Sequence, residues 1–260
     1  MRMRSVHDRA ELAALLSRDP VRHAYELGDL DDFFWPHTTW YALEDAVALL
    51  YHGAGTATLL LFGDPAGAAG ELIDQLEPVL PARFHAHLSI GLEKALETGD
   101  RRITSVEPHL RMALTGEPRP AAPAADVPVV ALGPADLAEL AALYAAAYPE
   151  NWFDARMLET GQYVGIRRGG ELLAVAGVHV WSPAYRVAAL GNVTTRPDVR
   201  GQGLAGTAVT ALVRRLRPAV DHIALNVRAD NAAAIALYRR LGFTEASRFV
   251  ELDAAPARTD

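Results

Sequence analysis

The sequence predicts an α/β protein in which a mixed, mostly antiparallel sheet is flanked by helices, together with a further α/β domain at its N-terminal end. Apolar strands alternate with amphipathic helices along the 260 residues, 50% of which are hydrophobic and 22% charged, as in globular domains. Five of the 16 prolines fall between Glu117 and Pro134, a pattern typical of an interdomain linker. We therefore expect an N-terminal α/β domain at 1–117, a linker at 118–127 and a second domain at 128–253.

The N-terminal segment shows both helical and strand periodicities. In its first helix Leu12, Leu15 and Leu16 share one face, and Gly53-Ala54-Gly55 between two apolar runs indicates a β-hairpin. The expected elements are a helix at Val6–Ser17, strands at Ala46–His52 and Thr56–Phe62, a helix at Gly67–Leu76, a strand at Phe84–Leu88, a helix at Leu92–Glu97 and extended chain at Val106–Leu114.

The C-terminal segment has a sharper pattern. Pro134 can open a helix because its missing N–H is not needed in the first turn, and Gly242 can end one in a left-handed conformation. The expected elements are a strand at Val129–Leu132, a helix from Pro134 to Tyr148, strands at Tyr163–Arg167, Leu172–Trp181 and Val187–Thr195, a helix at Gly203–Leu216, a strand at His222–Val227, a helix at Ala232–Leu241 and extended chain at Phe243–Leu252.

Composition and charge exclude several classes of protein. There is no cysteine, which excludes a disulfide framework and any thiolate metal site or nucleophile. No apolar run approaches the ~20 residues of a membrane helix, and the start of the chain does not resemble a secretory signal. The net charge of −7 argues against general nucleic-acid binding. We expect a cytoplasmic protein with neither a nucleic-acid nor a membrane partner, and the oligomeric state is left open.

A glycine-rich segment, Arg200-Gly201-Gln202-Gly203-Leu204-Ala205-Gly206, separates a strand from a helix. Free N–H groups in the first turn of a helix, with the helix dipole, form a site for a phosphate or diphosphate. The same residues also fit the dinucleotide pattern Gly201-x-Gly203-x-x-Gly206, but only 54 residues follow Gly206, too few for a doubly wound sheet. A plain turn that starts a helix is the third interpretation.

A second motif favours the first interpretation. Residues 226–243 read NVRADNAAAIALYRRLGF, and residues 193–205 upstream read VTTRPDVRGQGLA. As a pair, in this order and at this distance, they resemble the acetyl-CoA-binding half of the GNAT acetyltransferase superfamily. The resemblance is strongest over 187–252, extends over 127–252, and is nearest to the glycine N-acyltransferase-like branch, whose members also carry a divergent N-terminal domain. Residues 1–117 bear a faint likeness to a degenerate GNAT half.

This resemblance implies a GNAT fold and acetyl-CoA as co-substrate, with no metal required. The strand that ends at Thr195 would separate from its neighbour and pair with the pantetheine arm, and backbone amides from Arg200 onward would hold the diphosphate. Asn231 matches a position that hydrogen-bonds the pantetheine, although it could equally serve only as a helix cap. The implied cofactor-binding residues are Val193, Thr195, Arg200, Gly201, Gln202, Gly203, Leu204, Ala205 and Asn231.

Tyr238 matches the GNAT position that protonates the departing CoA thiolate, a role a phenol can perform at neutral pH. Its spacing turns it about 100° from Leu237 around the helix, so we expect it off the core face that Leu237 and Leu241 share. A structural tyrosine packed against the sheet is the alternative. The general base is left open among Glu150, His179 and a water held by Asn192.

The expected activity is direct acetyl transfer to the amine of a small-molecule or amino-acid-like acceptor, and the alternative is an acetyl-CoA-binding sensor without chemistry. Asn151-Trp152-Phe153 is expected near the acceptor, and the aromatic residues 33–41 belong to the N-terminal core or line an acceptor cavity. His85 and His87 share one face of a predicted strand and could ligate a metal, but the sequence offers no third ligand nearby, so we expect them to be structural.

Overall fold

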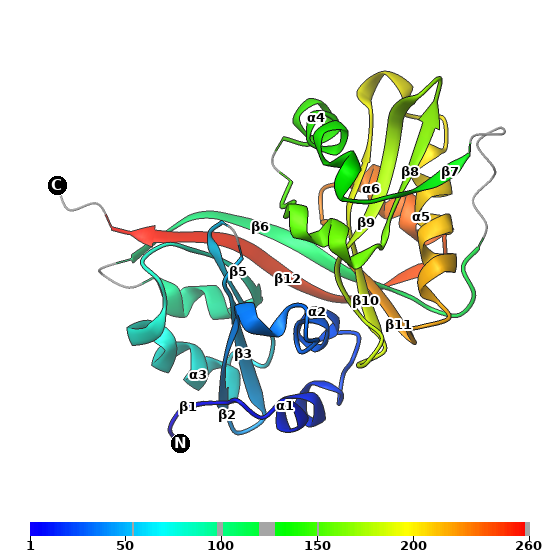
Figure 1. The fold of residues 1–260 in the computed structure, drawn as a ribbon. Coiled ribbons are helices and arrows are strands. Elements are labelled where there is room, and N and C mark those ends of the chain that lie inside the picture. The colour runs from blue at the N-terminus through cyan, green and yellow to red at the C-terminus, as the bar shows by residue number, and fades with distance from the viewer. Residues whose placement is uncertain (54, 98–100, 120–127, 150, 258–260) are drawn as a thin grey trace. The chain divides into compact units, whose positions relative to one another are not determined.

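The computed structural model describes residues 1–53, 55–97, 101–119, 128–149 and 151–257 (Figure 1). The chain divides into two compact units, each treated separately below. Unit 1 comprises Met1–Arg111, Val227–Asp230 and Glu245–Asp260, and unit 2 comprises Met112–Asn226 and Asn231–Thr244. The predicted boundaries at 117, 127 and 253 use continuous segments, whereas these units draw on interleaved ones; most of the predicted linker lies outside the described residues. Within the described residues, no helix combines the length and apolar character needed to cross a membrane.

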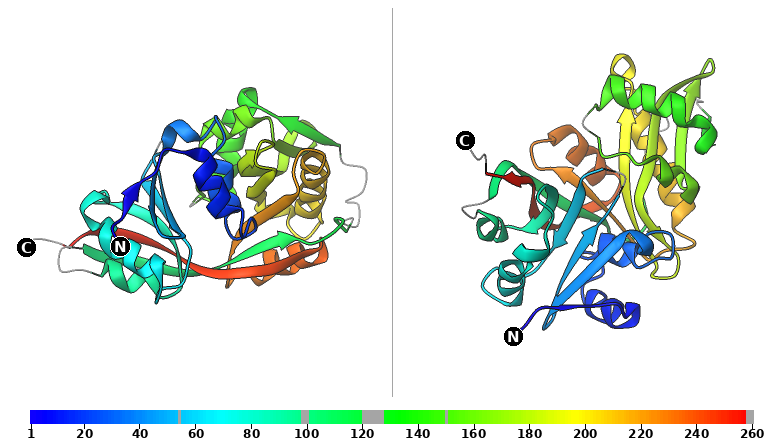
Figure 2. Two further views of the ribbon diagram at one scale, coloured as in Figure 1. Left: turned by 90° about the horizontal axis from the view of Figure 1, so that it is seen from below. Right: turned by 60° about the vertical axis from the view of Figure 1, so that its left-hand side comes forward.

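Unit 1 is built on strands in the order β1-β2-β3-β4-β5-β12-β6, in which β4 and β5 run parallel and the pairs β2–β3, β3–β4 and β5–β12 antiparallel. Helix α3 packs on β2 and β3, where Leu72, Ile73 and Leu76 enter the core (Figures 1 and 2). The elements are β1 (Arg4–Ser5), α1 (Arg9–Leu16), α2 (Ala24–Asp29), β2 (Thr38–Leu43), β3 (Ala46–Tyr51), β4 (Ala57–Leu61), α3 (Ala68–Leu76), β5 (Phe84–Ser89), β6 (Arg101–Leu114) and β12 (Phe243–Pro256), with 3₁₀ turns η1 (Trp35–His37), η2 (Glu77–Val79) and η3 (Leu92–Leu96).

Most predicted elements of unit 1 are confirmed. The first helix begins three residues late, at Arg9, because the Asp8 carboxylate accepts hydrogen bonds from the N–H groups of Ala10 and Glu11. The hairpin is present, since β3 and β4 pair antiparallel. Segment 92–97 is a 3₁₀ turn and not an α-helix. Helix α2 and strands β1 and β2 are additional to the prediction, and Trp40 of the aromatic segment is a buried core residue on β2.

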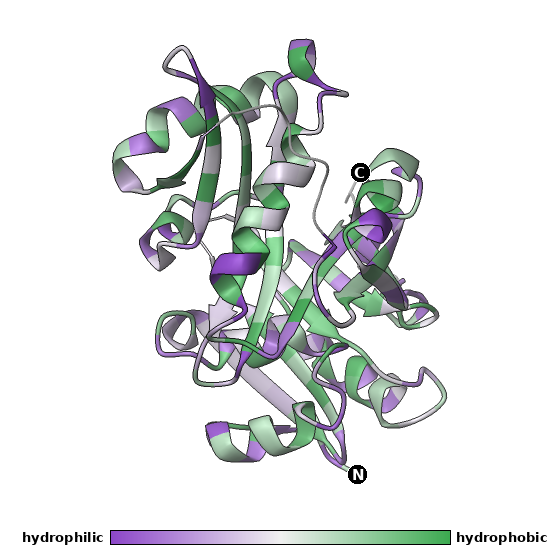
Figure 3. Ribbon diagram, turned by 90° about the vertical axis from the view of Figure 1, so that its right-hand side faces the viewer, coloured by the Kyte–Doolittle hydropathy of each residue, from purple (hydrophilic) through white to green (hydrophobic). Residues whose placement is uncertain are grey.

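Unit 2 contains strands in the order β11-β10-β9-β8-β7, all antiparallel except the β10–β11 pair. Helices α4 and α5 pack on this sheet, and hydrophobic residues dominate its strands while hydrophilic ones gather on loops and outer helix faces (Figure 3). Every strand and helix predicted for this part is confirmed. The elements are β7 (Val129–Leu132), η4 (Pro134–Asp136), α4 (Leu137–Ala147), η5 (Ala155–Thr160), β8 (Tyr163–Arg168), β9 (Glu171–Ser182), β10 (Val187–Thr195), η6 (Pro197–Val199), α5 (Leu204–Leu216), β11 (His222–Arg228) and α6 (Ala232–Arg240).

Two paired glycines open space on one face of this sheet. Gly177 of β9 lies opposite Gly191 of β10. A Cβ at Gly177 would overlap the ring of Tyr163, and a Cβ at Gly191 would overlap the imidazole of His179. Since paired residues of neighbouring strands have their side-chain positions on one face, both rings cover the same face. The glycines therefore allow two aromatic side chains to lie directly on the backbone.

We expect Gly177→Ala to lower the free energy of unfolding by about 1–3 kcal/mol, because the added methyl group must displace the fully buried Tyr163 ring. Urea denaturation measures the change. Gly55→Ala is the matched control, since a Cβ there meets no atom within 4 Å, and we expect a change within about 0.5 kcal/mol. Equal changes in the two variants would contradict the packing argument.

Candidate functional site

Strand β10 carries an irregularity at the place where the motif begins. Its register against β9 shifts between Gly191 and Thr194, and Asn192 inside this bulge has a φ of +55°. Asparagine tolerates the left-handed region better than most residues, and bulges recur next to active sites because they re-aim side chains. After the bulge, Asn192 and Thr194 are buried while Val193 and Thr195 are partly exposed. The two residues predicted to face the cofactor thus share one partly open face.

A buried network of phenols holds this bulge in place. The Tyr144 hydroxyl donates to the carbonyl of Asn192 at 3.1 Å, and the Asn192 side-chain amide donates to the Tyr163 oxygen at 2.9 Å. The Tyr163 hydroxyl in turn donates to the carbonyl of Val178 at 3.1 Å. Burial raises the pKa of both tyrosines, so each remains a protonated donor at neutral pH. Neither tyrosine was predicted, because no local motif marks them.

Strand β10 extends past the end of its parallel pairing with β11. The β10–β11 pairing joins Val187–Leu190 to His222–Leu225, and β10 then runs on to Thr195. The buried Oγ1 of Thr195 has no hydrogen-bond partner within the described part of the chain. A strand end that has left its parallel neighbour β11, with a hydroxyl that has no partner among the described residues, fits an extended, amide-containing ligand such as a pantetheine arm.

The glycine-rich segment forms the turn that leads into helix α5. Gly201 and Gly203 both adopt left-handed conformations, with φ of +80° and +78°. Gly203 is the N-cap, where no side chain accepts a hydrogen bond, and no acidic residue lies in the first turn. The N–H groups of Leu204 and Ala205 therefore lack an intrahelical acceptor. The donor set fits an anion, and the left-handed glycines let it approach the backbone closely.

The charged and polar side chains around this loop have partly structural roles. Arg200 donates from Nη2 to the carbonyl of Ala147 at 2.9 Å and from Nε to the carbonyl of Thr195 at 3.2 Å. Its guanidinium therefore ties the end of α4 to the end of β10 and leaves a positive charge exposed beside the loop. The Gln202 amide oxygen accepts from Arg168 at 3.4 Å.

Asn231 acts as the N-cap of α6. Its Oδ1 accepts a hydrogen bond from the N–H of Ala234 at 3.1 Å, so the capping interpretation accounts for this oxygen. The side chain is exposed, and among the described residues its amide nitrogen has no hydrogen bond. Its predicted contact with a pantetheine remains a prediction.

Tyr238 lies on α6 in the same unit as the glycine-rich loop. The sequence pattern placed Leu237 on the core face and Tyr238 off it, but the structure buries Tyr238 and leaves Leu237 partly exposed. The ring packs edge-on against Phe243, with centroids 5.9 Å apart. Burial, and then the nearby Tyr148, raise the pKa of Tyr238 above its ordinary value. The phenol is therefore protonated at neutral pH.

Aromatic side chains cover the face that the two glycines open. The Trp152 ring lies 6.3 Å from that of His179, and Phe153 lies 4.9 Å from Tyr144. Trp152 is 39% exposed and His179 is partly exposed, so both are reachable from solvent. Glu150, another candidate base, lies outside the described residues. This face is where the topology predicted acceptor contacts.

The family comparison identifies the domain. Residues 135–243 match the acetyltransferase (GNAT) family, and this part of the chain is a GNAT acetyltransferase domain. The resemblance drawn from the two motifs is thereby confirmed, while the glycine N-acyltransferase-like detail stays a prediction.

Individual relatives add detail. Over 96 residues the chain is 36% identical to an L-methionine sulfoximine/L-methionine sulfone acetyltransferase of Pseudomonas paraeruginosa, covering 35% of this chain and 56% of that protein. The chain thus spans just over half the length of this curated relative. A solved GNAT-family structure from Novosphingobium aromaticivorans is 26% identical, with a TM-score of 0.65 over 81% of this chain and 89% of its own.

A tandem GNAT protein from the clavulanic acid biosynthesis pathway has the same fold over the full length of both chains, with a TM-score of 0.57 and 17% identity. Its likeness extends across the N-terminal part of the chain, which the family model does not match. The GNAT fold is therefore shown, and a tandem protein is compatible with the division of the chain into two units.

We expect Asn192→Ala to lower the free energy of unfolding by roughly 1–2 kcal/mol more than Asn192→Gly does. Both variants lose the hydrogen bond to Tyr163, but only alanine must adopt the left-handed conformation against the steric preference of its Cβ. Chemical denaturation of the pair isolates the backbone cost. If the two variants were equally stable, the positive φ would not constrain this position.

Proposed function

We propose that the chain is an acyl-CoA-dependent N-acyltransferase that moves an acetyl group from acetyl-CoA to the amine of a small-molecule or amino-acid-like acceptor. The proposal rests on two features of one unit. Strand β10 continues beyond the end of its pairing with β11, and helix α5 begins at a glycine that has no side chain to accept hydrogen bonds from the first-turn N–H groups. These two features suit the two chemically different parts of coenzyme A. One offers hydrogen bonds to an amide-rich arm, and the other offers amides to a diphosphate.

Acetyl-CoA would supply a thioester whose acyl carbon is open to attack by an amine. The chain would bind the diphosphate with N–H groups from Gly201 to Ala205, with the helix dipole and Arg200 adding positive potential. Val193 and Thr195 would face the pantetheine, and Asn231 would add a polar contact from α6. A backbone N–H of β10 near Val193 would stabilise negative charge that develops on the acyl oxygen.

Tyr238 would donate its Oη proton to the departing sulfur. Its burial keeps the phenol protonated and reduces competition from water for that proton. The structural alternative, a ring that only packs on Phe243, is compatible with the same contact. Only a functional measurement separates the two roles.

The acceptor would lie on the aromatic face formed by Trp152, Phe153 and His179. The relative from Pseudomonas paraeruginosa acetylates amino-acid-like compounds, which favours a small acceptor bearing an α-amino group. Asn192 uses its amide N–H and its carbonyl in the bulge network, so His179 is the titratable group best situated among the described residues to take the amine proton.

We expect Ala205→Asp to weaken acetyl-CoA binding by about tenfold or more while leaving the protein as stable or slightly more so. A carboxylate in the first turn is favourable to the helix dipole but repels a bound diphosphate, so the two effects have opposite signs. Isothermal titration gives the affinity and thermal denaturation the stability. The isosteric Ala205→Asn variant is the control, and equal affinities in the two variants would argue against a diphosphate at this loop.

We expect Tyr238→Phe to lower kcat by roughly 10²–10⁴-fold with little change in acetyl-CoA affinity, because it removes a proton donor and keeps the packed ring. Thioester consumption with a panel of amino-acid-like amines measures this loss. Tyr185→Phe, in the turn between β9 and β10 of the same unit, makes the same chemical change at a residue with no role in the proposal and should be neutral.

Wild-type turnover that survives in Tyr238→Phe would remove the acid role. Saturable acetyl-CoA binding with no wild-type turnover on any amine would instead favour a sensor module and overturn the enzymatic proposal.

A further inference from the structure

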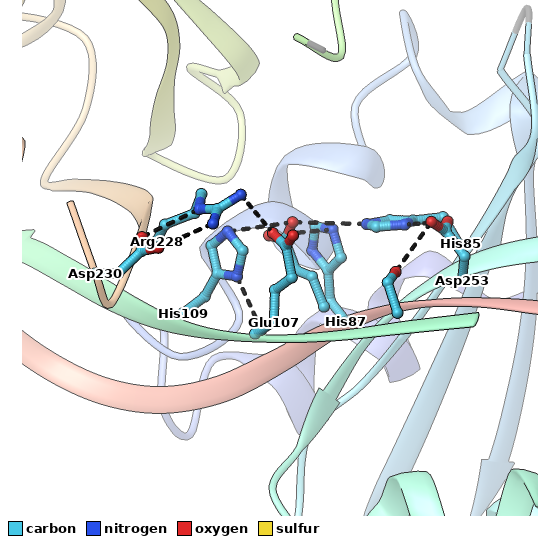
Figure 4. Close-up of polar contacts among 9 residues, drawn as sticks. His85, His87, Glu107, His109, Arg228, Asp230 and Asp253 are labelled. Carbon is cyan, nitrogen blue, oxygen red and sulfur yellow. Dashed lines mark hydrogen bonds and ion pairs between the residues drawn. The ribbon is translucent and has the colours of Figure 1, made fainter. Parts of the chain in front are cut away.

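Unit 1 gathers three histidines and two carboxylates that the acetyl-transfer proposal does not use. His85 and His87 lie on one face of β5, and their antiparallel partners on β12 are Asp253 and Glu251. His109 comes from β6. Figure 4 shows the three imidazoles on the same side of these strands, with Asp253 beside His85. The sequence interpretation found only His85 and His87, because the other members come from strands far along the chain.

One carboxylate lies at the centre of the three rings. The Nε2 atom of His85 is 3.6 Å from Oε2 of Glu251, that of His87 is 3.5 Å from Oε1, and that of His109 is 3.4 Å from Oε2. The ligand atoms of His85, His87 and Glu251 all lie within 4.8 Å of one another. Two imidazole nitrogens and a carboxylate are ligands that suit Zn²⁺, and His109 lies beside this group of three, close to Glu251.

The outer ring nitrogens of His85 and His109 each face a hydrogen-bond acceptor. Nδ1 of His85 is 3.0 Å from the Asp253 carboxylate, an acceptor, so this nitrogen carries the hydrogen. Nδ1 of His109 likewise donates to the carbonyl of Glu107 at 3.1 Å. In the neutral rings, Nε2 of both residues is then an unprotonated lone pair directed at a carboxylate oxygen. Either a proton on an imidazole or a metal ion between the groups would stabilise such an arrangement.

The distances favour a metal ion over shared protons. A charge-assisted hydrogen bond between these atoms would measure about 2.7–2.9 Å, well below the observed 3.4–3.6 Å. Ligand atoms of a tetrahedral zinc site, each about 2.0–2.1 Å from the metal, stand about 3.3–3.4 Å apart. The three nitrogen-to-oxygen gaps around Glu251 are closer to the second geometry, and side-chain movement would bring the ligand atoms, now within 4.8 Å of one another, to the spacing of a metal site.

The surroundings suit a bound cation that ions can reach. The side chains of His85 and Glu251 are 25% and 20% exposed, and that of His109 is 8% exposed. The nearest exposed arginine, Arg228, is neutralised by Glu107 at 3.0 Å and Asp230 at 2.9 Å (Figure 4). Arg111, buried against Phe249, has Glu26 as its counter-ion. His85 and His109 have a carboxylate and a carbonyl partner on their outer ring nitrogens, as metal-binding histidines typically do, whereas the buried Nδ1 of His87 has no hydrogen-bond partner among the described residues.

We propose that His85, His87 and Glu251 bind one divalent transition-metal ion, Zn²⁺ in the first instance, with His109 as the fourth group at the site. The ligands come from three strands, so the ion would cross-link β5, β12 and β6 within unit 1. This site is separate from the residues of the acetyl-transfer proposal and does not depend on it.

The test uses the untagged full-length chain, stripped with a chelator, dialysed and titrated with Zn²⁺. We expect one equivalent of zinc to remain after gel filtration and the melting temperature to rise with zinc concentration. Co²⁺ in place of Zn²⁺ should give the visible absorption bands of a four-coordinate site. Less than about a tenth of an equivalent bound, or no cobalt bands, would overturn the proposal.

Matched variants locate the ion. Asp253→Asn removes only the partner of His85 and should weaken zinc binding about 10–100-fold, and the isosteric Glu251→Gln should weaken it further. His52→Gln removes a histidine outside the cluster and should bind as the wild type does. Zinc binding that is equally strong in Glu251→Gln and in the wild type would show an adventitious ion only. If Glu251→Gln failed to fold, the half-exposed Asp253 variant would still decide the question.

Discussion

The geometry of the candidate acyl-transfer site depends on one residue held in an unusual backbone conformation. Asn192, at a φ of +55°, breaks the register of β10 at the point where its ladder with β11 has already ended. Two buried phenols hold it from either side through its carbonyl and its side chain. Without this lock, β10 would continue as a regular strand, and Val193 and Thr195 would exchange faces with their neighbours, since a slip of one residue inverts a strand.

The lock in turn requires the small residues beside it. Tyr163 reaches Asn192 only because Gly177 leaves its ring room to lie on β9, and His179 lies on Gly191 in the same way. The bulge, the phenol network and the aromatic face therefore depend on one another through the same packing contacts. A methyl group at either glycine would disturb the strand end, the aromatic wall or both.

Much of this architecture could be predicted from the sequence where local chemistry is decisive. Every strand and helix of unit 2 follows from periodicity and capping, and the loop at Gly201 and Gly203 follows from residues that tolerate positive φ. Long-range packing could not be predicted. Helical spacing alone placed Leu237 inward, whereas the structure buries the larger Tyr238 ring against Phe243, because tertiary packing overrides a one-residue difference in helix phase.

The histidine cluster also shows that long-range packing could not be predicted from local sequence. The alternation of His85 and His87 placed two imidazoles on one face, but a donor set becomes complete only when β5 pairs with β12, some 160 residues later in the chain. The pairing register then sets Glu251 opposite His87 and Asp253 opposite His85, one facing the centre and the other holding an outer ring nitrogen. Since strand pairing fixes which side chains meet, a shift of one residue would direct both carboxylates to the other face. The cluster is therefore a consequence of register, and any ion it binds would stabilise that register over its alternatives.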